Sequence, residues 1–188
     1  ILALVRMYGL DADPTWLDAA GRAARYLAAV RDRGVADAAL PHDHWLLYGL
    51  ADLERIRPDP DLRAHGLRIA RSIARAQVGA AGPQPGAWDD DGRSTPAATR
   101  LEGLVAALAL AEGRADDVAL LSVAIRRGCA FLVRTQLTAA RAKAAGIGGA
   151  GVGAFTDSVD GGEARIDYSQ HALSALLAYA RALGAGRL

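Results

Sequence analysis

Residues 95–113 read TPAATRLEGLVAALALAEG, and this stretch decides the fold class. Its leucines and its valine recur at helical spacing on a background of alanine, with no alternating strand pattern. Alanine and leucine both favour helix. Thr95 followed by Pro96 is typical of a helix start, with Thr95 as the capping residue, and Gly113 is typical of a helix end. The stretch therefore predicts a helix that is apolar on most of its surface and buried.

Five further segments have similar start and stop signals. Asp13-Pro14 and Asp59-Pro60 repeat the capping residue followed by proline. Asp116 is expected to cap one more helix. We expect six helices, over residues 14–34, 42–57, 60–77, 95–113, 116–136 and 167–184, and no strand.

The composition agrees with an all-α fold in a single domain spanning residues 1–188. Apolar residues make up 52% of the sequence, enough for a sizeable core. The 22 basic and 21 acidic residues leave a net charge of +1. This balance gives no reason to expect nucleic acid or an anionic membrane as a partner. No apolar run approaches the roughly 20 residues that a membrane-spanning helix needs.

Specific chemical motifs are few. The lone Cys129 excludes a disulfide framework and indicates a small core residue, with a catalytic thiol as the alternative. One cysteine is compatible with the cytosol, so a cytoplasmic location is favoured. His42 and His44 are two residues apart and diverge by about 200° on a helix, so we expect no shared metal ion. No phosphate-binding glycine loop follows a strand, and no cofactor is expected.

The connections differ in length. They are short after the second and fourth helices and long over residues 34–41, 78–95 and 137–166. The second, fourth and sixth helices are more apolar and are expected to form a buried inner layer. The others have an arginine-rich face and are expected to lie outside. Two layers of helical hairpins describe an α/α toroid or a partial arc of one. The inner helices would then all begin at one rim.

That rim collects most of the unusual polar residues. Carboxylates, imidazoles, an arginine and aromatics occur in the first turns of the three inner helices, an inventory that suits acid–base chemistry on a polar substrate. Alternatives exist for each residue. Asp167 and Gln170 have the spacing of a capping box, and Asp43 could cap a helix. His171 could be a hydrogen-bonded core histidine.

Arg100 and Glu102 lie in the most apolar helix. Burying either charge without a partner is costly, so each should be paired or face a cavity. Trp45 is a candidate for stacking on a sugar ring, with core packing as the alternative. Trp88 lies in a loop beside three aspartates, where sugar binding and a solvated turn are both open.

Two segments carry a resemblance to a known superfamily. Residues 94–103 (STPAATRLEG) and 165–176 (RIDYSQHALSAL) resemble parts of six-hairpin and related α/α-toroid proteins. That group includes glycoside hydrolases, unsaturated-uronyl hydrolases, polysaccharide lyases and sugar 2-epimerases, and it neighbours the terpenoid cyclases. Residues 89–92 (DDDG) do not match the Asp-x-Asp-Asp-Thr motif of acid-initiated cyclases. A closed toroid needs more than the three hairpins expected here, so a missing segment or a second subunit would complete it.

The resemblance implies a carbohydrate-active domain that acts on a polar small molecule or an oligosaccharide. Glu102, Asp167 or Asp43 would serve as acid or base, and His171 would assist. Arg100 would hold a carboxylate or a hydroxyl group. A non-catalytic helical module for binding or assembly and a terpenoid-cyclase-like enzyme are the alternatives. The candidate substrate-binding residues are His42, His44, Trp45, Tyr48, Trp88, Arg100, Tyr168 and Gln170.

Overall fold

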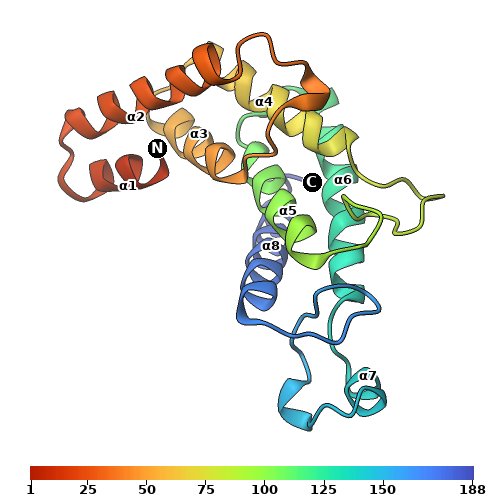
Figure 1. Ribbon diagram of the computed structural model, residues 1–188. Helices are drawn as coiled ribbons and strands as arrows, with labels where there is room; N and C mark the ends of the chain where they lie inside the picture. Colours follow the sequence, from red (N-terminus) through yellow and green to blue (C-terminus); the bar gives the residue numbers. More distant parts are fainter.

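The computed structural model describes residues 1–188 and is entirely helical (Figure 1). The predicted all-α class is confirmed, since the only β interactions are three isolated bridges. No helix is long and apolar enough to cross a membrane. The helices are α1 (Leu2–Asp11), α2 (Pro14–Tyr26), α3 (His44–Ile56), α4 (Pro60–Arg75), α5 (Ser94–Ala107), α6 (Ala115–Arg134), α7 (Ala139–Ala144) and α8 (Ile166–Gly184).

Two predicted helix starts are confirmed, and a third helix begins two residues later than predicted, at His44, with Asp43 in its alternative role as the cap. The side chain of Asp13 accepts a hydrogen bond from a backbone amide in the first turn of α2, and Asp59 does the same for α4. A proline follows each of these two caps. Asp43 caps α3, where its Oδ1 accepts from the amide of Leu46 at 2.9 Å. These starts depend on local chemistry alone, which explains why the sequence reveals them.

Three other predicted caps are wrong. The residues that precede the helices are Arg93 for α5, Arg114 for α6 and Arg165 for α8, and none of them caps through its side chain. Thr95, Asp116 and Asp167 therefore lie inside the first turn. At α5 and α8 the reason is tertiary. Bridges between the segment 156–158 and the residues before each helix, Arg93 and Ala164, fix where the helix begins.

Helix α1 was not predicted from the sequence. This helix packs against α2 and α3, and Ile1 lies so close to Gly49 of α3 that a Cβ there would be 2.8 Å from the isoleucine side chain. Helix α2 ends earlier than predicted, in a π-helical turn over Leu27–Arg31. Helix α5 ends at Ala107, and irregular turns continue to Gly113, whose φ of 77° suits glycine.

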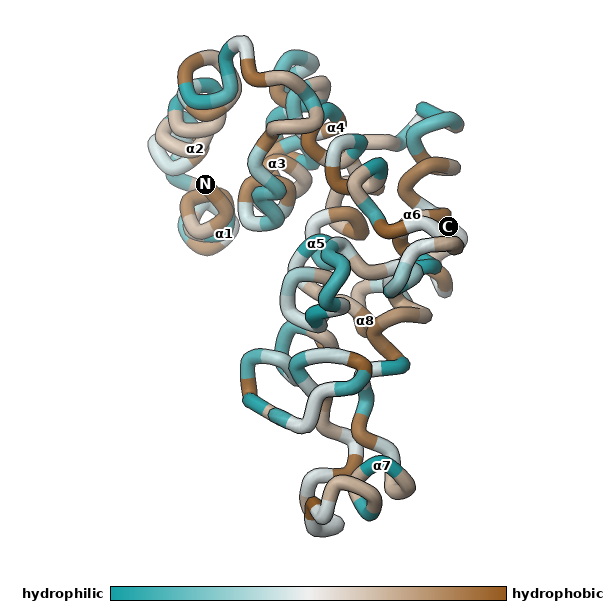
Figure 2. Tube along the Cα trace, turned by 45° about the vertical axis from the view of Figure 1, so that its right-hand side comes forward, coloured by the Kyte–Doolittle hydropathy of each residue, from teal (hydrophilic) through white to brown (hydrophobic).

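The helices pack in two rows. Helices α1, α3, α5 and α8 are successive neighbours, and α2, α4 and α6 pack beside them (Figure 1). One continuous hydrophobic cluster extends from Val5 in α1 to Ala182 in α8. Along most helices, hydrophobic and hydrophilic stretches alternate as amphipathic packing requires (Figure 2). Cys129 belongs to this cluster, and burial raises the pKa of its thiol to about 12, which excludes a reactive thiolate.

The second, fourth and sixth predicted helices correspond to α3, α5 and α8. Their expected burial is confirmed for α3 and α5 and is wrong for α8. Only Ala172, Ala175 and Ala182 of α8 are buried. Leu173 and Leu177 are 54% and 47% exposed, on a face that no other helix covers.

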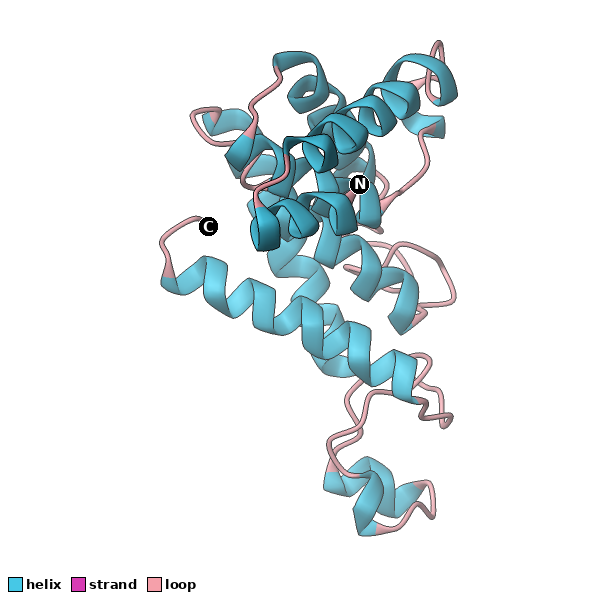
Figure 3. Cartoon of the chain, turned by 90° about the vertical axis from the view of Figure 1, so that its left-hand side faces the viewer, coloured by secondary structure: helices cyan, strands magenta, loops and turns pink.

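The long connection from α6 to α8 extends away from the helices and contains α7 (Figures 1 and 3). Arg141 of α7 fastens its base, because its guanidinium donates to the carbonyl oxygens of Gln136 (2.9 Å) and Val159 (2.7 Å). The connection then returns to the start of α8.

Candidate functional site

The beginning of α3 packs against the third turn of α5, which in turn contacts the second turn of α8. Gly103 of α5 makes this approach possible, because a Cβ at its position would be only 3.0 Å from the Cβ of His44 in α3. Glu102, the preceding residue, links α5 to α8 through His171. His44, Glu102 and His171 are therefore brought together as predicted, but only His44 lies in the first turn of its helix, since Glu102 is in the third turn of α5 and His171 in the second turn of α8.

Glu102 and His171 form a hydrogen-bonded pair. Oε2 of Glu102 lies 3.0 Å from Nδ1 of His171. The glutamate is only 5% exposed, whereas the imidazole is partly accessible. A buried carboxylate that holds an accessible imidazole fixes the ring and leaves Nε2 free for proton transfer. The hydrogen bond to a buried carboxylate agrees equally with the alternative of a hydrogen-bonded core histidine, since the imidazole is 19% exposed.

His44 lies next to this pair. Its ring meets that of His171 edge-on, with the ring centres 6.2 Å apart. Its Nε2 is buried and has no hydrogen-bond partner in the chain. Burial lowers the pKa of His44, while the nearby Glu102 carboxylate acts in the opposite direction. The second imidazole is therefore neutral near pH 7 and retains an unused nitrogen.

Two aromatic side chains border His44. The ring centre of Trp45 is 5.1 Å from that of His44 and 5.9 Å from that of Tyr48. Trp45 is 59% exposed, so core packing does not account for it. Together with Asp43 and apolar residues of α1 and α2, it lines a hollow of about 420 Å³. Tyr48 is half-buried, and burial raises the pKa of its hydroxyl.

Arg100 and His42 form a second pair on the same helices. Nε of Arg100 donates to Nδ1 of His42 at 2.9 Å, and Nη1 donates to the carbonyl of Pro96 at 3.0 Å. Because Nδ1 accepts, the neutral imidazole carries its proton on Nε2, which lies 3.5 Å from Oγ of Ser72. Burial lowers the pKa of His42, and the charge of Arg100 lowers it further.

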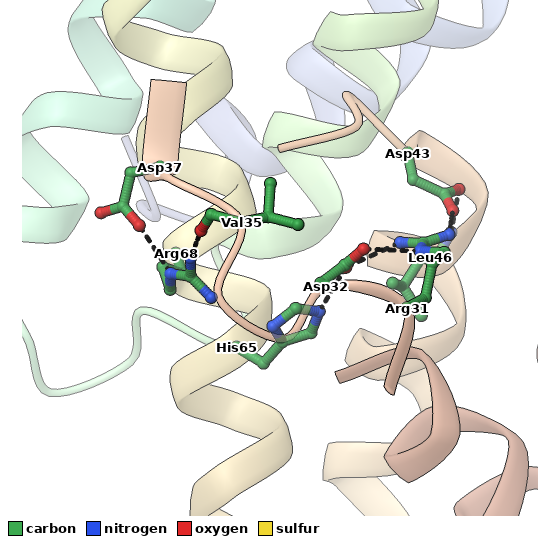
Figure 4. Close-up of polar contacts among 8 residues, drawn as sticks. All are labelled: Arg31, Asp32, Val35, Asp37, Asp43, Leu46, His65 and Arg68. Atoms are coloured by element: carbon green, nitrogen blue, oxygen red, sulfur yellow. Dashed lines mark hydrogen bonds and ion pairs between the residues drawn. The ribbon is translucent and has the colours of Figure 1, made fainter. Parts of the chain in front are cut away.

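Asp43 belongs to a different network, which Figure 4 shows. Its Oδ2 accepts from Arg31 at 2.9 Å, and Arg31 also holds both oxygens of Asp32 at 2.7 and 2.9 Å. Asp32 is 1% exposed and lies 3.0 Å from Nε2 of His65. Arg31 holds the pKa of Asp32 below its usual range, and burial lowers that of His65. This network anchors the start of α3 to α2 and α4.

Sequence reasoning did not find this network. Arg31 and Asp32 lie at the end of the π-helical turn, whose extra residue per turn alters the direction of the side chains that follow. A polar His65 among apolar residues of α4 was the one available signal, and it does not identify a partner.

The remaining candidate residues lie apart from the histidines or are already bonded to other side chains of the chain. Asp167 pairs with the exposed Arg165 at 3.0 Å and does not form the predicted capping box with Gln170, which is exposed. The hydroxyl of Tyr168 donates to Glu163 at 3.0 Å.

The structure overturns the prediction that Trp88 stacks on a sugar. It is buried in the core, and its Nε1 donates to the carbonyl of Ile73 at 2.6 Å. A ring enclosed in this way cannot stack on a sugar. The aspartates that follow it do form the predicted solvated turn, since Asp90 and Asp91 are exposed. The indole instead packs between α4, α5 and α6.

A second hollow, of about 730 Å³, lies at the opposite end of the helices, where Glu54, Arg63, Glu112 and Arg187 give it a mixed polar lining. No group of three or more histidine, cysteine or acidic side chains is arranged to hold a metal ion. The chain matches no protein-family model, no curated protein and no solved structure.

Proposed function

We propose that this chain is part of an α/α toroid and is a carbohydrate-active domain that transfers protons at the rim where the inner helices begin. The observation that carries the proposal is the hydrogen-bonded pair of Glu102 and His171 with His44 beside it. The row of α1, α3, α5 and α8 supports an arc, since α1 takes the inner position before α2. Further hairpins, from a longer chain or a second subunit, would extend the arc beyond α8.

The acidic and basic side chains at this site favour proton transfer at a carbon atom over glycoside hydrolysis. Hydrolysis of a glycosidic bond uses two carboxyl groups on either side of the bond. Here Glu102 is the one carboxylate beside the histidines, because Asp43 is bound to Arg31 and Asp167 to Arg165. The two imidazoles are edge-on neighbours, with ring centres 6.2 Å apart, and can act together on the same side of a sugar to remove and return a proton at one carbon. An epimerase or lyase reaction therefore fits better than a hydrolase.

Each residue then has a defined role. His171, oriented by Glu102, is the first acid–base group, and neutral His44 is the second. Trp45 offers an exposed ring next to His44 on which the apolar face of a sugar can stack. Tyr48 has a raised pKa, so its hydroxyl stays protonated and can donate a hydrogen bond.

Solvent isotope exchange tests this proposal. The protein is incubated in D₂O with a panel of neutral sugars, uronic acids and their oligosaccharides, and deuterium in the sugar is read by mass spectrometry and NMR. We expect deuterium at one carbon, and its loss in Glu102→Gln and His171→Ala. Asp90→Asn, which removes an exposed carboxylate, is the matched control. Sugar cleavage without exchange would indicate a hydrolase, and no reaction would reject the proposal.

A non-catalytic helical module for binding or assembly is the second candidate. The exposed leucines of α8 favour it, because an uncovered apolar helix face is typical of an interaction surface. The internal pairing of rim charges, such as Arg31 with Asp43, also agrees with a structural role. A terpenoid cyclase has less support, because the hollow beside Trp45 contains few aromatic residues.

A further inference from the structure

Helix α8 has a continuous exposed stripe on the side away from the core. The helix packs on α5 and α6, and its buried residues are the small Ala172, Ala175 and Ala182. Six residues are exposed along the α8 stripe: Ile166, Gln170, Leu173, Leu177, Ala180 and Gly184. They follow one another at alternating intervals of four and three residues, which keeps them on one narrow face over about 27 Å of helix. Such spacing is that of a seam between two packed helices.

The exposed stripe is large and apolar at one end and small at the other. Ile166, at the start of the helix, is 88% exposed, and the long side chain of Gln170 follows. The other end has Ala180 and Gly184. Nothing lies within 4 Å of the place where a Cβ on Gly184 would stand, so this end leaves open space. A face of this shape is complementary to a second copy of itself turned end to end.

An antiparallel pair of α8 helices would match these residues by size. If the pair is centred between Leu173 and Leu177, Ile166 meets Gly184 of the second copy, and Leu173 meets Leu177. A two-fold axis repeats each contact. A parallel pair would instead place Ile166 on Ile166 and Gly184 on Gly184, which crowds one end and leaves a gap at the other. The antiparallel arrangement also places opposite ends of the two helix dipoles together.

Two charged residues border the stripe on the same side. Asp167 follows Ile166, and Arg181 follows Ala180, so the two lie at equivalent places beside the stripe and at nearly equal distances from its centre. In the antiparallel pair, Asp167 therefore faces Arg181 of the second copy, and the two-fold axis gives this contact twice. Arg181 is exposed and has no ion pair within the chain, while Asp167 is paired only with the exposed Arg165.

We propose that α8 pairs antiparallel with α8 of a second copy of this chain, through the exposed stripe. The inference goes beyond the proposed catalytic function and does not depend on it. The second copy occupies the open position beside α8 at the end of the row of inner helices, so two arcs meet end to end. One pair of helices is a small interface, so we expect a weak dimer with a dissociation constant of about 10–100 μM.

Sedimentation equilibrium of the whole chain at about 5–500 μM tests the proposal. We expect the mass to rise with concentration from 19.5 kDa toward twice that value. Leu173→Glu puts a charge at the centre of the stripe, and because the two-fold axis places it there twice, it should weaken association by at least about 100-fold. Leu10→Glu is the matched control, since Leu10 is 81% exposed on α1 at the other end of the row. It should leave association unchanged, and circular dichroism checks that both variants remain helical.

Two charge variants test the orientation. Arg181→Glu sets a like charge against each Asp167, and Asp167→Arg does the same to each Arg181, so either variant alone should associate about fivefold more weakly. An equal mixture of the two restores both opposite-charge pairs in the heterodimer and should associate about as tightly as the unmodified chain. In a parallel pair these positions lie about 21 Å apart along the helices, so mixing would bring no gain.

The outcomes decide the proposal separately from the catalytic function. A monomer at every concentration would overturn it, as would a dimer that Leu173→Glu leaves intact. A dimer that Leu173→Glu disrupts, but that gains nothing when the charge variants are mixed, would overturn the antiparallel arrangement. If Leu173→Glu does not fold, the mixing experiment still decides, because it changes only surface charges. Failure of isotope exchange would leave the mass of the dimer unaffected, so the two proposals can fail independently.

Discussion

Oε2 of Glu102 in α5 lies 3.0 Å from Nδ1 of His171 in α8, although 69 positions separate the two residues. The bond joins the third turn of α5 to the second turn of α8 and orients the imidazole. We expect the pair to stabilise the fold as well as to serve the site. A double-mutant cycle with Glu102→Ala and His171→Ala, measured by urea denaturation, should give a coupling energy of about 1–3 kcal/mol.

The same cycle contains its own control. Because Glu102→Gln keeps an oxygen that can accept from Nδ1, it should lose clearly less stability than Glu102→Ala. Additive effects of the two alanine substitutions would mean that the bond contributes nothing to the folded state.

The buried carboxylate of Asp32 should be more important for stability than for chemistry. It holds Arg31 with two bonds and contacts His65, which ties the end of α2 to α4 (Figure 4). Asp32→Asn removes one charge of this set and should lower the free energy of unfolding by about 2–3 kcal/mol.

The matched control is Asp37→Asn. Asp37 also pairs with an arginine, Arg68, but its side chain is 56% exposed. Water screens this pair, so we expect a loss of at most about 1 kcal/mol. Chemical denaturation measures both variants. Equal losses would show that burial of Asp32 does not strengthen its contacts.

Features that depend on neighbouring residues were predicted correctly from the sequence, whereas features that depend on distant residues were not. The caps at Asp13 and Asp59 were predictable, because the interacting atoms lie two or three residues apart. The start of α8 at Ile166 was not predictable, because it follows a β-bridge between Ala164 and the distant Thr156. The sequence placed Glu102 and His171 at one rim through hairpin geometry but could not pair them.

Burial of single side chains was the least predictable feature. Trp88 lies in a loop of acidic and glycine residues, which indicates exposure, yet its indole fills the space beside Gly128 of α6. Leu173 and Leu177 have the spacing of a core-facing stripe, yet they face outward because no helix of this chain covers that side of α8. Helical periodicity identifies an apolar face but does not identify what covers it.

Gly128 should be intolerant of even one methyl group. A Cβ at this position would lie 2.7 Å from Cδ2 of Leu101 and 2.9 Å from the ring of Trp88, which its bond to Ile73 holds in place. Gly128→Ala should therefore lower the free energy of unfolding by about 1–3 kcal/mol.

Gly9→Ala is the control, since nothing lies within 4 Å of the corresponding Cβ in α1. There the gain in helix propensity is unopposed and should stabilise the protein by up to about 1 kcal/mol. Thermal and urea denaturation compare the two variants. A neutral Gly128→Ala would mean that α5 and α6 separate easily at this point.

His42 should make the stability of the fold depend on pH. Burial lowers its folded pKa below the value of about 6.5 for a free imidazole. Below about pH 6.5 the unfolded chain binds the proton more readily, so the free energy of unfolding decreases as the pH falls toward the folded pKa. Protonation at Nδ1 would also displace the bond from Arg100. The contribution of His42 is complete above pH 6.5 and is lost in acid.

His42→Asn tests this dependence, because its side-chain oxygen can replace Nδ1 as the acceptor for Arg100 but does not titrate. Urea denaturation at intervals between pH 7.5 and 5 gives the slope of the unfolding free energy for both proteins. The slope should be smaller in the variant by at most about 1.4 kcal/mol per pH unit, the effect of one proton. A residual slope is expected, because burial also lowers the pKa values of His44 and His65. Identical slopes in the two proteins would show that His42 is protonated as easily in the folded chain as in the unfolded one.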